Sequence, residues 1–204
     1  MTTLTAFALN CTLKPSPASS STELLMSQIL ADLESHGVST SSARLVDFDV
    51  KPGVETDMGN GDEWPGIRKQ ILDADIFVVV TPTWVGQLTS VGQQILERLD
   101  AELSETDSKG RPILYDRVAV VGVVGNEDGA HHITAQLFQG LADLGFTISS
   151  QASTYWNGEA MQSVDYKDLP KTPDAVASAT SALAANAAHL AGLLKGNPYP
   201  VPAD

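Results

Sequence analysis

The stretch "DIFVVVTPTWVG", residues 75–86, decides the fold that this chain can adopt. Five consecutive apolar residues, 76–80, precede a proline, and "RVAVVGVVG", residues 117–125, repeats the apolar run. Such runs leave no polar face along the strand, which is typical of parallel strands that are covered by helices on both sides. These two segments therefore predict the interior of a parallel sheet.

The rest of the chain alternates between strand-forming and helix-forming segments. Strands are expected at 4–9, 42–48, 75–80, 117–125 and 146–153, and helices at 21–37, 66–74, 90–103, 132–145 and 174–195. This alternation predicts an α/β fold, a doubly wound sandwich in which a five-stranded parallel sheet carries helices on both faces. We expect a single domain over residues 1–204, with residues 51–64 as an insertion or lid and residues 174–195 as a C-terminal helix.

Composition and charge exclude several classes of protein. The formal net charge of −13 argues against nucleic acid and anionic membrane as partners, because both need clustered Lys and Arg. The longest apolar run, residues 76–80, is far shorter than the roughly 18 residues of a membrane-spanning helix. The first ten residues lack the basic region of a signal peptide, and a single cysteine, Cys11, cannot form an internal disulfide. We therefore expect a cytoplasmic protein.

The segment after the first expected strand can form an anion site. "NCTLKPSPASSST", residues 10–22, is rich in hydroxyl groups, carries one lysine and runs directly into a helix. A helix N-terminus offers unpaired N–H groups and a partial positive charge, which suit a phosphate. The alternative is an ordinary loop in which Ser21 or Thr22 caps the helix. Neither G-x-x-x-x-G-K-[ST] nor G-x-G-x-x-G is present here, which disfavours an ATPase or a common dinucleotide fold.

Aromatic residues and glycines follow the later strands at the same edge of the sheet. Pro82 ends a strand ladder, Gly86 permits close approach or a positive φ, and Trp84 offers a broad apolar face. "GNEDGAHH", residues 125–132, and "TYWNGEA", residues 154–160, place further glycines there. This pattern suits a flat ring with polar edges. The alternatives are that Trp84 packs against a helix or a second subunit, and that Asp128 only caps the following helix.

Two other chemistries find little support in the sequence. A phosphatase of the C-x5-R type needs an arginine six residues after its cysteine, and Pro17 holds that position relative to Cys11. The adjacent His131 and His132 point in different directions on most backbones, and no third ligand stands at a helical spacing from them. We therefore expect no cysteine nucleophile and no metal site.

The loops together resemble the NAD(P)H-dependent FMN reductase family, a branch of the flavodoxin-like flavoproteins. The family's L-N-G-S-x-R and S-N-T segments correspond to "LNCTLK" and "SSST" here, and its T-P-x-[YW]-x-G loop corresponds to "TPTWVG". A glycine-rich fourth loop corresponds to residues 125–129. The resemblance covers residues 4–156 and assigns FMN binding to Thr12, Lys14, Ser20, Ser21, Thr22, Pro82, Thr83, Trp84, Val85, Gly86, Gly125, Asn126, Asp128 and Gly129.

This resemblance implies a flavodoxin-like fold and an FMN-dependent oxidoreductase. A hydride would pass from NAD(P)H via FMN to a small-molecule acceptor such as a quinone or a flavin, with no catalytic side chain and no metal. Backbone N–H groups of residues 83–86 would edge the ring. Family members often form a homodimer or homotetramer, so Trp84, Trp156 and residues 51–64 are candidates for a subunit contact.

The chain departs from the family pattern in its first loop. Cys11 replaces a glycine, and Lys14 replaces an arginine, which removes a bidentate fork. The loop is also about three residues longer. Two other functions stay open: a flavodoxin-type electron carrier without turnover of its own, which the acidity favours and the missing T-x-T-G-x-T pattern disfavours, and a flavodoxin-like scaffold without cofactor.

Overall fold

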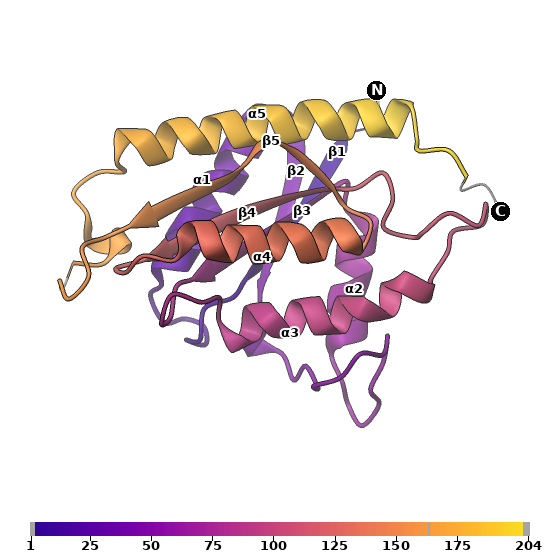
Figure 1. Ribbon diagram of the computed structural model, residues 1–204, viewed down its shortest axis with the longest axis horizontal. Helices are drawn as coiled ribbons and strands as arrows, with labels where there is room; N and C mark the ends of the chain where they lie inside the picture. The colour runs from indigo at the N-terminus through magenta and orange to yellow at the C-terminus, as the bar shows by residue number, and fades with distance from the viewer. Residues whose placement is uncertain (1–2, 163, 202–204) are drawn as a thin grey trace.

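A five-stranded parallel sheet forms the middle layer of the structure, a computed structural model that describes residues 3–162 and 164–201 (Figure 1). The strand order is β2-β1-β3-β4-β5, and every neighbouring pair is parallel. The sheet and its layers confirm the predicted doubly wound sandwich. The strands are β1 Leu4–Asn10, β2 Val38–Arg44, β3 Ile76–Pro82, β4 Val118–Gly125 and β5 Thr147–Asn157.

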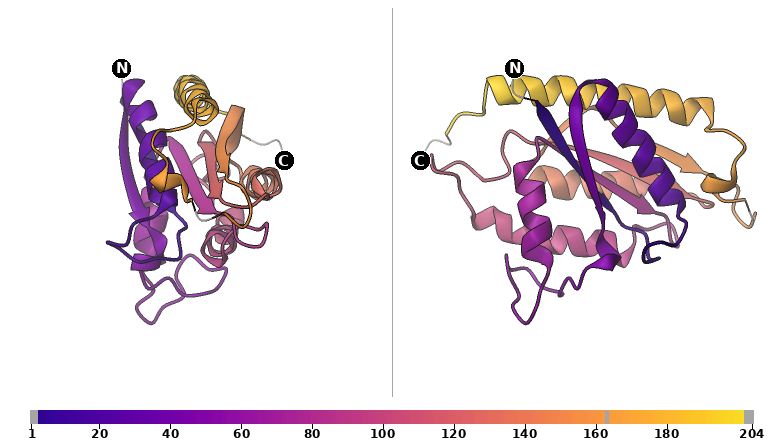
Figure 2. Two further views of the ribbon diagram at one scale, coloured as in Figure 1. Left: turned by 90° about the vertical axis from the view of Figure 1, so that its left-hand side faces the viewer. Right: turned by 180° about the vertical axis from the view of Figure 1, so that it is seen from behind.

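Helices cover both faces of the sheet (Figure 2). Alternate residues of β3 point to opposite sides: Val78 and Val80 pack with α1 and α5, whereas Phe77 and Val79 pack with α2, α3 and α4. Both sets are buried, which is why the strand reads as an unbroken apolar run. The helices are α1 Ser21–Ser35, α2 Trp64–Asp73, α3 Ser90–Leu99, α4 Ala130–Asp143 and α5 Asp174–Gly196, with 3-10 turns η1 Leu45–Asp47, η2 Asp100–Ser104 and η3 Tyr166–Asp168.

The second strand lies four residues earlier than the sequence predicts. We expected a strand over 42–48, but β2 ends at Arg44 and residues 45–47 form η1. The strand is the polar segment "VSTSSAR" because β2 is an edge strand with several exposed side chains. Leu45, which made the later segment look strand-like, is buried beyond the end of the strand, against the side of the sheet that α2 and α3 cover.

Hydrogen bonds and an ion pair hold residues 51–64 against α3. The guanidinium of Arg98 is fully buried and donates to the carbonyl oxygens of Lys51 and Glu55 at 2.6 and 2.8 Å. It also forms a 2.8 Å ion pair with Asp62, whose side chain is equally shielded from solvent. This polar cluster gives an irregular segment a fixed place beside α3. The helix that we expected over 90–103 is shorter in the structure: α3 ends at Leu99, and the 3-10 turn η2 follows.

The topology indicates at which end of the sheet a ligand can bind. The chain leaves β1 for β2 on one side and reaches β3 on the other side of β1, so the strand order reverses there. In open α/β sheets a ligand binds beyond the carboxyl ends of the strands at such a switch point. Those ends lie at the left of Figure 1.

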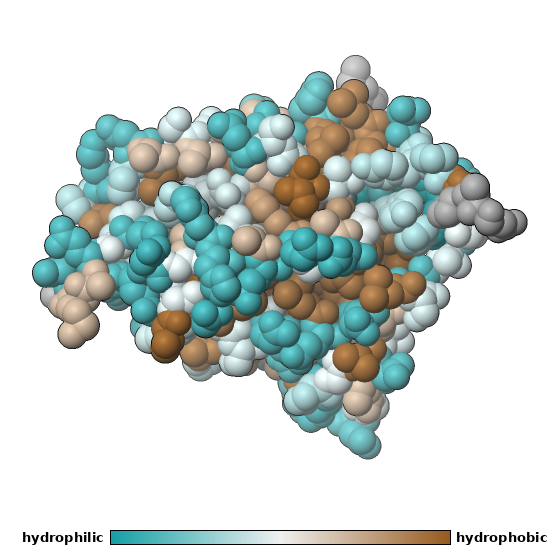
Figure 3. Space-filling model, in the orientation of Figure 1, coloured by the Kyte–Doolittle hydropathy of each residue, from teal (hydrophilic) through white to brown (hydrophobic). Residues whose placement is uncertain are grey.

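The outer surface is mixed in character. The face that α3, α4 and α5 present is largely hydrophilic, with separate apolar patches between polar side chains (Figure 3). Among the residues that the structure describes, no helix is long and apolar enough to cross a membrane.

Candidate functional site

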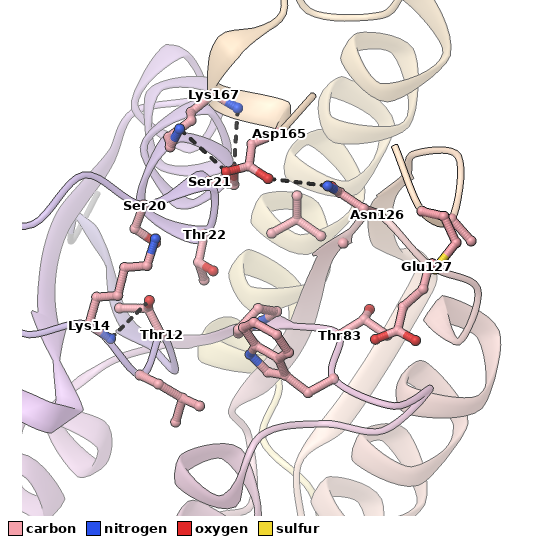
Figure 4. Close-up of a pocket in the computed structure, with 17 residues that line it drawn as sticks. Thr12, Lys14, Ser20, Ser21, Thr22, Thr83, Asn126, Glu127, Asp165 and Lys167 are labelled. Atoms are coloured by element: carbon pink, nitrogen blue, oxygen red, sulfur yellow. Dashed lines mark hydrogen bonds and ion pairs between the residues drawn. The ribbon is translucent and has the colours of Figure 1, made fainter. Parts of the chain in front are cut away.

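A cleft opens at the carboxyl edge of the sheet, between the loops that follow β1, β3 and β4 and a segment near residues 160–167 (Figure 4). Its volume is about 380 Å³, within the range of small-molecule sites, roughly 300–1,000 Å³. Ten of the fourteen residues that the sequence nominated line it: Thr12, Lys14, Ser20, Ser21, Thr22, Pro82, Thr83, Trp84, Gly125 and Asn126.

The N-terminus of α1 forms one end of the cleft. Ser20 is the capping residue, and its hydroxyl accepts a hydrogen bond from the N–H of Glu23. The alternative expectation that Ser21 or Thr22 caps the helix is therefore wrong. Ser21, Thr22 and Thr12 bring three more hydroxyl groups to the same place, next to the partial positive charge of the helix. This end of the cleft has the chemistry of a phosphate site.

The long first loop is held by residues from the end of β2 and from η1. Arg44 donates to the carbonyl oxygens of Lys14 and Ala18 at 3.1 and 2.9 Å. Asp47 accepts from both the hydroxyl and the N–H of Ser16, and these hydrogen bonds lower the pKa of its carboxyl group. Arg44 thus holds two carbonyl groups of the loop that carries Lys14. Nothing in the sequence pattern predicted this support, because Arg44 lies inside the segment 42–48 that we expected to be a strand.

A tight turn with two central residues positions Trp84 at the cleft. Trp84 and Gln87 exchange two backbone hydrogen bonds of 2.9 Å, and the residues between them have positive φ, 54° at Val85 and 69° at Gly86. This is the geometry of a type I′ turn. The structure thereby confirms the positive φ that we expected at Gly86. Trp84 lines the cleft and remains 55 % exposed, so its ring is available to a ligand.

The backbone N–H groups of residues 83–86 are less available than the sequence suggested. Those of Thr83 and Trp84 donate to backbone carbonyl groups within the fold. The N–H of Val85 donates to the carboxylate of Glu127 at 2.7 Å. A ligand edge could therefore reach the Val85 N–H only by displacing Glu127, a cleft residue that sequence reasoning missed.

The hydroxyl of Thr83 has no hydrogen-bond partner. Thr83 is 5 % exposed, lines the cleft and carries the one buried side-chain oxygen of the cleft that stays unsatisfied among the described residues. A buried hydroxyl without a partner costs free energy, so a polar ligand edge at this point would be stabilised. Together with the hydroxyl and lysine groups at α1, this orphaned oxygen shows that the cleft fits a ligand with a phosphate and a polar ring edge.

Two glycines bring the loops after β3 and β4 together. A Cβ atom on Gly125 would lie 2.7 Å from the Cβ of Thr83, and one on Gly129 would lie 2.8 Å from the carbonyl oxygen of Gly86. Only glycine permits these approaches. Four nominated residues shape this crossing without lining the cleft: Val85, Gly86, Asp128 and Gly129.

Asp128 does not cap α4 in the way that the sequence suggested. The capping residue is Gly129, which makes no side-chain cap, and the Asp128 carboxylate accepts from the N–H of Gly129 at 2.7 Å. The aromatic segment after β5 has a further role: the ring of Trp156 packs on Tyr166, with 5.5 Å between centroids. Trp156 is thereby engaged within its own chain, which leaves Trp84 as the exposed tryptophan at the cleft.

Seven residues that line the cleft were not nominated. They come from the same loops and from the segment after β5: Leu13, Val124, Glu127, Ala160, Met161, Asp165 and Lys167. Leu13, Val124 and Glu127 lie between or beside nominated residues, and sequence proximity could have identified them. The last four come from an irregular stretch that returns to the cleft through tertiary packing alone.

Cys11 and the paired histidines have other roles. Cys11 is completely buried, and desolvation raises the pKa of its thiol far above the ordinary value, so the thiol stays protonated. His131 and His132 contact Tyr155 and Gln87, at 3.1 and 2.9 Å. Among residues 3–162 and 164–201, no three His, Cys, Asp or Glu side chains gather to hold a metal ion.

Comparison with known proteins gives one family match and two relatives of differently named function. The family profile described as "NADPH-dependent FMN reductase" matches residues 6–160. An "8-demethyl-8-aminoriboflavin-5'-phosphate synthase" from Streptomyces davaonensis is 33% identical over 96% of this chain and 80% of its own length. A "Divalent metal cation transporter MntH" from Mycobacterium bovis is 37% identical over 81% of this chain, which spans only 25% of that relative's length.

Solved structures agree with these matches. The crystal structure of RosB with the bound intermediate 8-demethyl-8-formylriboflavin-5'-phosphate superposes with a TM-score of 0.87 and 31% identity, over 96% of this chain and 82% of RosB. An archaeal flavodoxin superposes with a TM-score of 0.60 and 10% identity, over 93% of this chain and 99% of the flavodoxin, which supports the fold alone.

Proposed function

Because this chain belongs to the NADPH-dependent FMN reductase family, we propose that it binds FMN in the cleft and uses it to reduce a small acceptor with electrons from NAD(P)H. The family membership makes the chain a flavodoxin-like flavoprotein of the oxidoreductase class. A quinone or a free flavin is the acceptor that we propose. The observation that carries the proposal is the convergence of hydroxyl groups, a lysine and an exposed tryptophan on one cleft.

The residues of the cleft divide into two groups along its length. Thr12, Lys14 and the hydroxyl residues 20–22 would hold the phosphate, because they surround the N-terminus of α1. Trp84 and Asn126 would contact the ring system from the loops after β3 and β4. The unpartnered hydroxyl of Thr83 would donate to or accept from a polar ring edge.

Bound FMN would supply the hydride-accepting chemistry itself, so the protein needs no acid–base pair. The chain contributes binding and orientation. The half-exposed ring of Trp84 leaves the mouth of the cleft accessible, which would let NAD(P)H and the acceptor use the same place in turn. Gly125 and Gly129 keep the loops after β3 and β4 in close contact beside the cleft.

A second candidate treats the flavin as the substrate instead of the resident cofactor. The specific observation in its favour is the likeness to a relative named for synthesis of an 8-amino flavin phosphate, which extends over 96% of this chain. In this alternative the same cleft would bind riboflavin 5′-phosphate and release a chemically changed flavin phosphate. Mass spectrometry of the flavin recovered after turnover separates the two candidates.

Rapid mixing tests the reductase directly. FMN-loaded protein is mixed anaerobically with NADPH or NADH, and the absorbance of oxidised flavin is followed. We expect rapid bleaching and, on addition of a quinone or free flavin, rapid recovery with the bound flavin unchanged in mass. No bleaching over minutes would favour an electron carrier, and a protein that takes up no FMN would favour a cofactor-free scaffold.

A further inference from the structure

Lys167 lies beside the phosphate end of the cleft but outside the region that the family profile matches, residues 6–160. Figure 4 shows Lys14 and Lys167 on two sides of the hydroxyl residues 20–22. Lys14 belongs to the loop after β1, whereas Lys167 belongs to the short turn η3 before α5. Two cations from distant parts of the sequence therefore flank the N-terminus of one helix.

Lys167 is held at this position by its neighbours. Its backbone N–H donates to the hydroxyl of Ser21 at 3.3 Å. The preceding residue, Tyr166, is buried, and its hydroxyl donates to the side chain of Gln28 on α1 at 2.6 Å. Trp156 also packs on that ring. The turn η3 is thus anchored to α1, and the backbone of Lys167 has a defined place over the first turn of the helix.

The ammonium of Lys167 pairs with two carboxylates, of which Asp165 lines the cleft. Its ammonium lies 2.6 Å from a carboxylate oxygen of Asp168 and 3.4 Å from one of Asp165, and its side chain is 22% exposed. Asp165 also accepts from Asn126 at 3.2 Å and lines the cleft. Lys167 thus offsets the charge of a carboxylate that lines the cleft.

We propose, on the premise of the function proposed above, that Lys167 is a second phosphate-binding cation and makes the cleft selective for a 5′-phosphorylated flavin over riboflavin. A chain with a net charge of −13 must attract a phosphate through local cations. A lysine is a compact charge on a flexible stem, so one lysine cannot reproduce the bidentate grip of an arginine. Lys14 and Lys167 together supply two charges from two directions.

Fluorescence titration with FMN and with riboflavin tests this assignment. In the Lys167→Gln variant we expect the Kd for FMN to rise by roughly 10- to 100-fold, because a hydrogen bond to a charged group is lost. We expect the Kd for riboflavin to stay within about twofold, and Lys167→Arg to restore most of the FMN affinity. Lys171→Gln is the matched control: that lysine is 74% exposed, pairs with Asp174 and does not line the cleft.

A double variant shows whether Lys167 acts by attracting the phosphate directly or by offsetting the charge of Asp165. Asp165→Asn combined with Lys167→Gln removes the carboxylate that Lys167 offsets, so the double variant should recover part of the FMN affinity that Lys167→Gln loses. If Lys167→Gln weakens the binding of FMN and riboflavin equally, or weakens neither, the assignment of Lys167 is overturned. The proposed function still stands in that case, provided that the wild-type protein binds FMN. A wild-type protein that binds neither flavin would overturn both.

Discussion

Val85 occupies a conformation that its side chain disfavours. Its φ of 54° lies in the left-handed region, where a β-branched residue is strained, and its side chain is 86% exposed. The type I′ turn imposes this conformation, since both central residues need positive φ. The strain sits at the rim of the cleft, where the Val85 N–H meets the Glu127 carboxylate. Such strain is typical of binding sites.

Relief of this strain should stabilise the fold. Asparagine tolerates the left-handed region, so Val85→Asn should raise the free energy of unfolding by about 1 kcal/mol. The comparison is Val54→Asn, at a valine that is 51% exposed and does not have a positive φ. That control should change stability by less than about 0.5 kcal/mol. Urea unfolding measures both, and a Val85→Asn protein no more stable than the control would contradict the account.

Glu127 places a negative charge inside the cleft that we propose for an anionic ligand. Glu127→Gln keeps an acceptor for the Val85 N–H but removes the charge. At a separation on the order of 10 Å, the lost repulsion should tighten FMN binding by roughly 3- to 10-fold. Glu97→Gln removes the same charge at an exposed position of α3 and should leave the Kd for FMN unchanged. Weaker FMN binding in Glu127→Gln would instead indicate a favourable contact with the flavin.

At the scale of elements, Arg98 joins an irregular segment to a helix. Its guanidinium and the Asp62 carboxylate are both shielded from solvent, so removal of one partner leaves a buried charge. Arg98→Met should therefore lower the free energy of unfolding by about 3–5 kcal/mol. Lys69→Met, in the exposed pair with Asp73 on α2, should cost less than about 1 kcal/mol. Similar losses in the two variants would show that Arg98 does not organise residues 51–64.

The same pair should make stability depend on pH. Burial alone would raise the pKa of Asp62, but hydrogen bonds from Arg98 and from backbone N–H groups outweigh it and hold the pKa well below its ordinary value. A carboxylate with a lowered folded pKa contributes stability that is complete above its unfolded pKa of about 4 and declines as the pH falls below that value. Urea unfolding between neutral and acidic pH should show this decline, and Asp62→Asn should flatten it. Parallel curves would contradict the assignment.

The sequence predicted the buried strands better than the edge strand. The buried strands β3 and β4 were predicted because their long apolar runs indicate burial on both faces of the sheet. The edge strand β2 was misplaced because its polar residues resemble a loop, while Leu45 and Val46 beyond it resemble a strand. The loops after β1, β3 and β4 were predicted because topology brings strand ends together.

The rest of the cleft depends on tertiary packing that leaves no local pattern. Asp165 and Lys167 reach the cleft because Tyr166 is buried against α1 and Trp156. The sequence separation of this segment from Ser21 does not predict that it lies at the cleft, and neither do its residue types. The hydrogen bond from Val85 to Glu127 is equally invisible, since it depends on the glycine crossing of two loops.

At the scale of the whole molecule, apolar side chains gather near the mouth of the cleft. Trp84 is 55% exposed and Met161 fully exposed, and both line the cleft, while Val85 adjoins it. Exposed apolar residues at the rim of a cleft can form a subunit contact while the cleft beside them stays open, so we predict a homodimer. Light scattering at micromolar concentration should give about twice the chain mass of 21.5 kDa.

A pair of variants locates that contact. Met161→Lys should shift the mass toward that of one chain. Val54→Lys, at an exposed valine of the segment 51–64, should leave the dimer intact if the contact lies at the rim of the cleft beside Met161. A wild-type protein with the mass of one chain at this concentration would contradict the homodimer.

In the function that we propose, the N-terminus of α1 and the loops around it bind the phosphate of a flavin. Ser21→Glu tests it most directly, because an acidic residue at a helix N-terminus favours the helix yet repels a phosphate there. Titration of FMN fluorescence should give saturable one-to-one binding to the wild-type protein and at least about 30-fold weaker binding to Ser21→Glu. Equal FMN affinity in the two proteins, or no binding to the wild-type protein, would contradict the account.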